Sequence, residues 1–218
     1  MKKLYYFSFL TLLFAGCGGD TAIDALSSSL ENNSERSQYG SKENNTYIPK
    51  SGIYNESDSQ EIKFLKVINY ARSQARECKN NDGTIHESSR GYFKAAPPLT
   101  INQELYSAAL EHSIDMAKSN TFSHYGSGTK WDTTGSNLGH PSSFRERIEA
   151  NGYSNYTMIG ENIAAGQKSI EEVVHSWLES PGHCANIMNP NYKEMGLARY
   201  EEPNSFYKVY WTNDFGSR

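Results

Sequence analysis

The segment Ser180-Pro181-Gly182-His183-Cys184-Ala185-Asn186-Ile187-Met188 carries most of the information about this chain. It follows an amphipathic helical pattern and precedes a pattern of two strands. The Pro-Gly pair is expected to end the helix, because proline does not continue one. His183 would then lie just past the helix end. Cys184 stands directly beside it, so a disulfide at Cys184 would hold this histidine in place.

Two other segments carry polar side chains: Phe122-Ser123-His124 and Gly160-Glu161-Asn162-Ile163-Ala164. Together with His183 they suggest one shared polar cleft, which Asn186 is expected to cap or orient. Each residue also has a structural interpretation. His124 could be a hydrogen-bonded surface or core residue, Glu161 could cap a turn, and His183 could be a charge at a helix C-terminus.

Three further groups of residues are assigned structural roles. His112 lies on an apolar helical stripe, which favours core packing over ligation. Trp177 and Trp211 are expected in the core, and Arg145-Glu146-Arg147 is expected to form a solvated face.

Composition excludes one class of partner. The chain has 218 residues, a formal net charge of −4 and a pI near 5.9, with a mean hydropathy of −0.70. A nucleic-acid-binding surface needs an excess of basic residues, so no nucleic-acid partner is expected. The length allows one ordinary domain plus additional segments.

Residues 1–17 are predicted to be a lipoprotein-type signal peptide. Lys2-Lys3 precede a short apolar run, Leu4 to Ala15, that ends in Phe14-Ala15-Gly16-Cys17. This ending resembles a bacterial lipobox, in which Cys17 would be lipidated after cleavage. Phe14 stands where leucine is usual, so a plain secretory signal is the alternative.

Three cysteines in an exported protein leave one unpaired. If Cys17 carries the lipid, Cys78 and Cys184 remain to pair in an oxidising compartment. The alternative is two buried free thiols. A disulfide closing so long a loop is expected to stabilise the fold by about 4–5 kcal/mol.

The remaining chain divides at about residue 58. Residues 18–57 are rich in Ser, Asn, Gly and Glu and are predicted to be a flexible tether. Residues 58–218 carry the folded domain. Apolar spacing predicts four helices, the first through Cys78, the second through about Ser119, the third from Ser143 to Gly152, and the fourth from Ser169. A β-hairpin is predicted over 194–212, and the mixture indicates an α+β class.

Six motifs occur in an order that resembles the CAP superfamily, the SCP-like extracellular domain that includes cysteine-rich secretory, antigen 5 and pathogenesis-related 1 proteins. The resemblance is closest to bacterial members and covers about Ser59 to Gly216. It implies a three-layer α-β-α sandwich. The motifs are Asn69-Tyr70-Ala71-Arg72, Pro98-Leu99, Phe122-Ser123-His124, Gly160 to Ala164, Trp177 to His183 and Tyr210 to Gly216.

The resemblance also implies a cleft with two histidines and two glutamates. His124, Glu161 and His183 match three of these positions. The fourth position is occupied by Ser180, and Glu179 lies one residue too early, about 100° away around a helix. The candidate cleft residues are therefore His124, Glu161, Glu179, His183 and Asn186.

Two imidazoles and a carboxylate suit a divalent cation, with Zn²⁺ bound by His124 and His183 as the first candidate. The principal hypothesis is a lipid-anchored or secreted binding module of the cell envelope or cell surface. Its ligand would be a lipid, a small molecule or a protein. The alternatives are a metal-dependent hydrolase, with His124, Glu161 and His183 as catalytic candidates, and a purely structural role for the polar residues.

Overall fold

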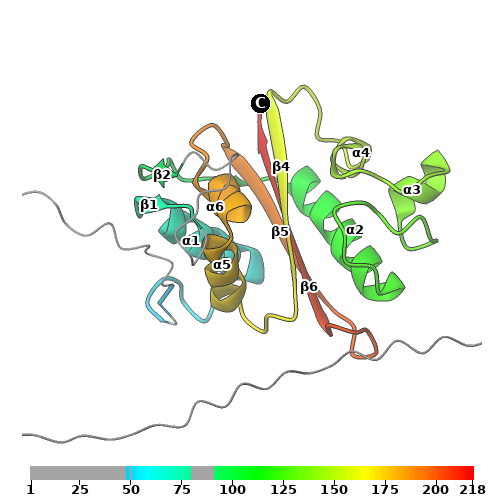
Figure 1. Ribbon diagram of the computed structural model, residues 1–218. Coiled ribbons are helices and arrows are strands. Elements are labelled where there is room, and N and C mark those ends of the chain that lie inside the picture. Colours follow the sequence, from blue (N-terminus) through cyan, green and yellow to red (C-terminus); the bar gives the residue numbers. More distant parts are fainter. Residues whose placement is uncertain (1–47, 50, 80–90) are drawn as a thin grey trace, which may run out of the picture. The chain divides into compact units, whose positions relative to one another are not determined.

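Figure 1 shows the computed structural model, which describes residues 48–49, 51–79 and 91–218. The predicted signal peptide with Cys17, and the tether up to residue 47, lie outside the described residues. No helix in the described part of the chain is long and apolar enough to cross a membrane.

A four-stranded sheet with the order β3-β5-β6-β4 forms the middle layer. β3 (Thr100–Ile101) runs parallel to β5 (Glu194–Glu201). β5 and β6 (Val209–Ser217) form the predicted hairpin. β4 (Met158–Ala165) pairs antiparallel with β6 and places Glu161 directly opposite Asp214. A separate pair of short strands consists of β1 (Arg76–Glu77) and β2 (Tyr92–Phe93).

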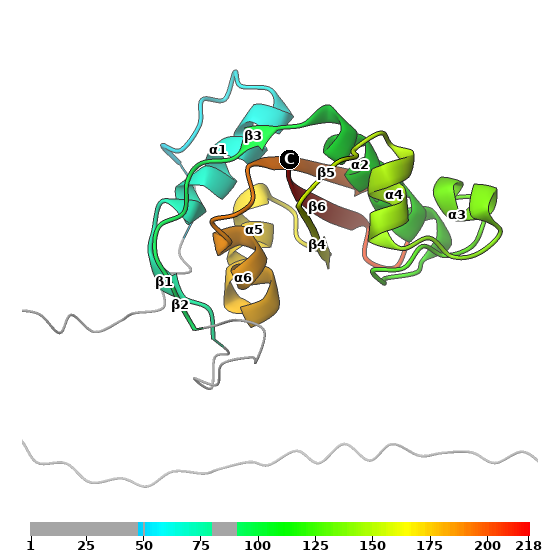
Figure 2. The ribbon, with the colours of Figure 1, turned by 90° about the horizontal axis from the view of Figure 1, so that it is seen from above.

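Helices cover both faces of this sheet (Figures 1 and 2), which confirms the predicted α+β class and layering. α1 (Gln60–Arg72), α5 (Ile170–Glu179) and α6 (Pro181–Met188) lie on one face. α2 (Gln103–Ser119), α3 (Thr133–Leu138) and α4 (Phe144–Ala150) lie on the other. Because both faces are covered, all nine residues of β6 are buried, including the polar ones.

The main apolar core lies between the sheet and α1, α5 and α6. Trp177 and Trp211 belong to it, as predicted, and each is only 1% exposed. A smaller cluster lies on the other face, where Leu105 and Ala108 of α2 meet Ile148 of α4.

The motif at the end of α1 joins this helix to neighbouring segments through hydrogen bonds between side chains and backbone groups. Asn69 exchanges two hydrogen bonds with the backbone of Leu99, at 2.8 and 3.0 Å. The buried Arg72 guanidinium donates to the carbonyls of Pro97, Ile187 and Asn189. Arg72 therefore fixes the C-terminal end of α6 against α1.

One helix prediction was wrong and a second was incomplete. The first helix ends at Arg72, not Cys78, because Ser73 caps it and Arg76–Glu77 instead pairs with β2. His183 lies past the end of α5, as predicted, but within the first turn of a new helix, α6. Ser180 separates the two helices, and Pro181 starts α6, since proline needs no donor at the first helical position.

The packed chain also begins before the expected boundary at residue 58. Ile48 is 5% exposed in the main core, and the Tyr54 hydroxyl donates to Glu171 at 2.6 Å. Ile53 packs against the same core. The segment predicted as tether therefore includes residues that pack on the folded domain, namely Ile48, Ile53 and Tyr54.

The Cys78–Cys184 disulfide is present, which confirms the predicted pairing. It joins the segment after α1 to α6 across a sequence separation of 106 residues. Both cysteines are fully buried.

Removing this cross-link is expected to lower the free energy of unfolding by about 4 kcal/mol, because the unfolded chain regains the entropy of the open loop. Urea denaturation of the Cys78→Ala/Cys184→Ala variant measures the loss. A change below 1 kcal/mol would contradict the cross-linking role assigned to this disulfide.

Candidate functional site

A pocket of about 440 Å³ opens at the edge strand β4, beside the start of α4 and the second half of α6. Its apolar wall includes Phe144 and Ile159. Its polar groups include His124, Glu161 and Asn186. Such a mainly apolar hollow with a few convergent polar groups is typical of a small-molecule site. The full lining is His124, Tyr125, Ser143, Phe144, Ile159, Gly160, Glu161, Asn186 and Tyr192.

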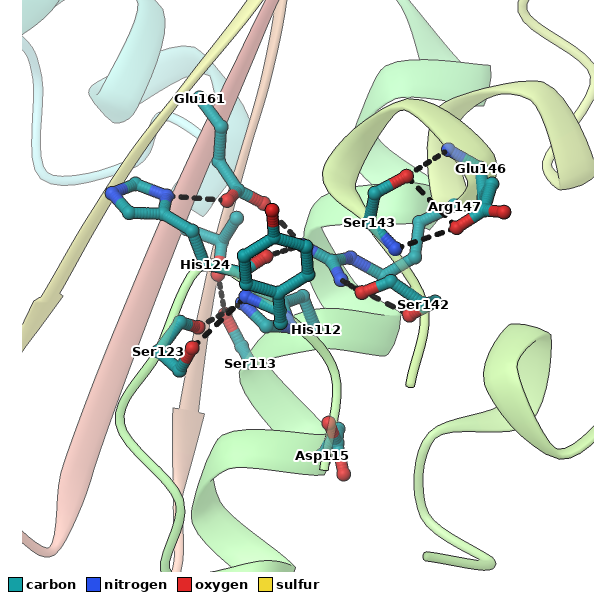
Figure 3. A network of polar contacts seen from close by, with 12 residues as sticks. His112, Ser113, Asp115, Ser123, His124, Ser142, Ser143, Glu146, Arg147 and Glu161 are labelled. Atoms are coloured by element: carbon teal, nitrogen blue, oxygen red, sulfur yellow. Dashed lines mark hydrogen bonds and ion pairs between the residues drawn. The ribbon is translucent and has the colours of Figure 1, made fainter. Parts of the chain in front are cut away.

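His124 and Glu161 form the central polar pair, as Figure 3 shows. His124 Nδ1 lies 2.7 Å from Glu161 Oε1, and the two side chains are 48% and 1% exposed. When Nδ1 carries the proton that it donates to the carboxylate, Nε2 of the neutral ring is an acceptor. In this tautomer the pair presents a hydrogen-bond acceptor at the pocket rim.

Arg147 holds the other oxygen of Glu161. Its Nη2 donates to Glu161 Oε2 at 2.8 Å and to the His124 carbonyl at 2.9 Å, and its side chain is 1% exposed (Figure 3). Nη1 donates to the carbonyl and the hydroxyl of Ser142. The prediction that this arginine belongs to a solvated face was wrong. α4 turns Arg147 inward, while its neighbour Arg145 is exposed.

Ser142 extends the network to a second buried carboxylate. Both its backbone N–H and its hydroxyl donate to Asp132, which also accepts from the N–H groups of Gly135 and Gly128. These hydrogen bonds together lower the pKa of the Asp132 carboxyl, although burial opposes them. Asp132 thereby fixes the loop that leads into α4.

Burial alone would raise the pKa of the Glu161 carboxyl. Positive charge on His112, the hydrogen bond from His124 and the contacts with Arg147 outweigh it and hold the pKa below its usual range. His112 is itself kept neutral near pH 7, because burial lowers its pKa to about 4. At neutral pH the ionised state of Glu161 therefore depends on Arg147 and His124.

Asp214 faces Glu161 across the β4–β6 strand pair, and its pKa is shifted in the opposite direction. Complete burial, and then the charge of Glu161, raise its pKa well above the usual range, and Arg147 only partly offsets this. Its Oδ1 has no hydrogen-bond partner among the described residues. Two carboxylates so close share one arginine, so the arrangement favours one proton on Asp214.

Asn186 and Asn162 connect β4 to α6. Asn186 Nδ2 donates to the Glu161 carbonyl and to Asn162 Oδ1, and Asn162 Nδ2 donates to the His183 carbonyl. These bonds hold α6 beside Glu161. They give Asn186 an orienting position at the pocket.

Gly160 allows Tyr192 to reach the pocket wall. A Cβ atom at residue 160 would lie 2.2 Å from the Tyr192 hydroxyl oxygen. Burial raises the pKa of Tyr192 to about 12, so its hydroxyl stays protonated and can donate. Tyr192 also stacks on Phe215, with ring centroids 5.2 Å apart.

The structure places the other two predicted cleft residues differently. Burial lowers the pKa of His183 to about 4, and a positive charge on His124, when that ring is protonated, lowers it further in the same direction. His183 is not among the residues that line the pocket. Glu179 points elsewhere. It pairs with His175 at 3.4 Å on α5, is 41% exposed, and does not line the pocket either. The predicted place of Glu179 in the cleft therefore has no support from this pocket and stays a prediction.

The donor set does not fit a resident metal ion. In the described ranges, no three His, Cys, Asp or Glu side chains gather so that they could hold one. Glu161 commits one oxygen to His124 and the other to Arg147. A protein site for Zn²⁺ uses three or four such ligands. The expected binding of Zn²⁺ by His124 and His183 stays a prediction.

Comparison with known proteins defines the class. The profile of the cysteine-rich secretory protein family, CAP, matches residues 93–215, which is more than half of the chain. With the fold and motifs described above, the chain belongs to this family.

Two relatives come from Bacillus subtilis (strain 168). The chain is 40% identical over 118 residues to the uncharacterized protein YkwD, covering 54% of this chain and 39% of that protein. It is 30% identical over 103 residues to the uncharacterized membrane protein YlbC, covering 45% of this chain and 25% of that protein. The chain thus matches well under half the length of either relative.

A solved structure agrees with the fold. An extracellular protein containing a SCP domain from Bacillus anthracis str. Ames superposes with a TM-score of 0.50 at 22% identity, covering 72% of this chain and 40% of that chain. At this identity the likeness shows the fold alone.

Replacing Arg147 with Met is expected to lower the free energy of unfolding by about 3 kcal/mol, because it leaves the buried Glu161 carboxylate without its cation. Arg145→Met is the matched control, two residues away on the exposed side of α4, and is expected to cost under 1 kcal/mol. Urea denaturation measures both. Equal losses would show that the buried ion pair is not what stabilises this site.

Acidification is expected to destabilise the protein through His112. Its pKa in the folded state, about 4, lies below the usual value of 6.5. Between these two values the unfolded state binds more protons than the folded state, so the free energy of unfolding decreases as the pH is lowered. The contribution between pH 7 and pH 5 is about 2 kcal/mol. Urea denaturation of the wild type and of His112→Gln at both pH values measures it. The idea fails if both proteins lose the same stability.

Proposed function

We propose that this chain is an exported CAP-domain binding module of the cell envelope. Its pocket takes a small ligand that has an apolar body and a hydrogen-bond donor. The observation that carries the proposal is the His124–Glu161 pair at the rim of the 440 Å³ pocket.

The geometry of that pair supports recognition of a donor group. Glu161 accepts the Nδ1 proton, so His124 offers Nε2 as an acceptor at a defined orientation. The His124 side chain is 48% exposed, which leaves Nε2 accessible. Phe144 and Ile159 supply apolar surface for the ligand body.

Two further groups suit a ligand with a second polar atom. The Tyr192 hydroxyl lines the pocket and makes no hydrogen bond to another described residue, so it is free to donate or accept. Asn186 lines the pocket on the same side of β4. A phenol, an alcohol or an amide would satisfy such a site, whereas a hydrocarbon would leave the polar groups without partners.

The alternative is a metal-dependent hydrolase acting on envelope or extracellular material. A carboxylate–imidazole pair is half of a general-base system. In the described part of the chain, however, no Ser, Thr or Cys side chain hydrogen-bonds to His124 Nε2, and Cys184 is in a disulfide. The site supports binding better than turnover.

The location is proposed from the sequence. A lipid on Cys17, or secretion after cleavage of the leader, would place the domain outside the cytoplasm. In accord with this, one relative is described as a membrane protein and one structural neighbour as an extracellular protein. The expected partners remain a small molecule, a lipid or a protein, and the charge of −4 argues against nucleic acid.

Phenol and toluene form a matched pair of probes, since they differ in the hydroxyl donor. We expect phenol to bind about five- to tenfold more tightly than toluene, because one hydrogen bond contributes about 1 kcal/mol. Chemical-shift titration in two-dimensional NMR measures both affinities. The difference should vanish in His124→Phe and persist in the control His175→Phe, which alters an exposed histidine on α5.

Signals that shift with phenol but lie away from residues 124, 161 and 192 would contradict the proposed site. A parallel titration with Zn²⁺ tests the metal alternative. Tight binding of Zn²⁺ that is lost in His124→Phe would favour the metal reading over the one proposed here.

A further inference from the structure

The tip of the β5–β6 hairpin carries large apolar side chains that face solvent. Phe206 is 78% exposed and Tyr207 is 42% exposed. Phe122, 46% exposed, follows the end of α2 and packs against Tyr207 with ring centroids 5.8 Å apart. Contiguous exposed apolar groups of this kind mark interaction surfaces. We call Phe122, Phe206 and Tyr207 the aromatic tip.

The loop backbone holds this exposure in place. The Phe206 N–H donates to Asn120 Oδ1 at 2.7 Å, and Asn120 is the left-handed residue that ends α2. The buried Ser205 hydroxyl donates to the Glu202 carbonyl and accepts from the Lys208 N–H. Phe206 therefore projects from a fixed loop and has no pocket of its own to fill.

Positive charge surrounds the aromatic tip. Lys118 pairs with Glu202 and lies 5.7 Å from the Trp131 ring centroid, and Lys130 lies 4.9 Å from the same ring. Neither Lys130 nor Lys208 has an ion-pair partner in the described ranges. With Arg199 and Glu201, which pair on the same hairpin, four basic side chains thus stand against two glutamates, on a chain whose net charge is −4.

We infer that the aromatic tip docks on a bilayer surface that carries anionic headgroups. Aromatic rings favour the boundary between headgroups and acyl chains, and neighbouring lysines are attracted to anionic lipids. The tip projects from a loop, and Phe206 offers no hydrogen-bonding group, which suits insertion better than stacking on a polar glycan. Figure 1 shows this loop at the end of the sheet away from the C-terminus.

This inference relies on the proposed function only for the location near a membrane. A chain from Cys17 to Ile48 can span at most about 100 Å, so an anchored domain could turn its tip toward the bilayer. The pocket takes no part in the contact with the bilayer. A failure of phenol to bind at the pocket would therefore leave the membrane inference standing, and a failure of vesicle binding would leave the pocket proposal standing.

Sedimentation with vesicles tests the inference on the chain from residue 18, which lacks the leader and any lipid. It retains the whole compact unit Tyr39–Arg218. We expect binding to vesicles of equal parts phosphatidylglycerol and phosphatidylcholine. Phe206→Ser/Tyr207→Ser should weaken that binding at least tenfold. Tyr92→Ser, which alters an aromatic 49% exposed on β2, should leave it unchanged.

A second pair of measurements tests the charges. Lys130→Gln/Lys208→Gln should weaken binding to the anionic vesicles several-fold, and added salt should have the same effect. The inference is overturned if the wild type does not bind anionic vesicles, or if the Phe206/Tyr207 variant binds as well as the wild type. Self-association that depends on Phe206, without vesicle binding, would assign the tip to a second copy of the chain.

Discussion

The ionised carboxylate of Glu161, buried between the edge strand β4 and helix α4, is the constraint on which this site depends. A charge in such a place is tolerated only when it is paired and hydrogen-bonded. Arg147 supplies the cation and His124 the second hydrogen bond, so the carboxylate fixes both the loop after α2 and the helix α4. The orientation of His124 toward the pocket is a consequence of this pairing.

The rest of the fold keeps Glu161 in position. Asn186 and Asn162 join the strand of Glu161 to α6, Arg72 binds the carbonyls at the other end of α6, and the Cys78–Cys184 disulfide links α6 to the segment after α1. On the opposite face, Asp132 fixes the loop into α4 through Ser142. Most of these side chains bond to backbone groups, so they specify the path of the chain as well as its stability.

Much of this could be predicted from the sequence, and the failures have physical causes. Helical spacing and N-terminal caps located α2, α4 and α5, and cysteine counting found the disulfide. Arg147 was missed because its neighbours Arg145 and Glu146 are charged and helical spacing alone does not reveal an inward arginine. Its position one turn after the Ser143 cap and beside the buried Ile148 was the available signal.

Asp214 and Tyr192 were missed for a different reason. Their roles depend on strand pairing between distant segments, which local patterns do not encode. The available signal was the run of polar residues Thr212, Asn213 and Asp214 within a strand rich in aromatics.

A ¹³C NMR titration of the side-chain carboxyls measures the pKa values of Glu161 and Asp214 directly. We expect the Glu161 carboxyl to titrate below its usual pKa and the Asp214 carboxyl to titrate well above its usual pKa. A pKa of Asp214 at or below the usual value, or a pKa of Glu161 above it, would contradict this assignment.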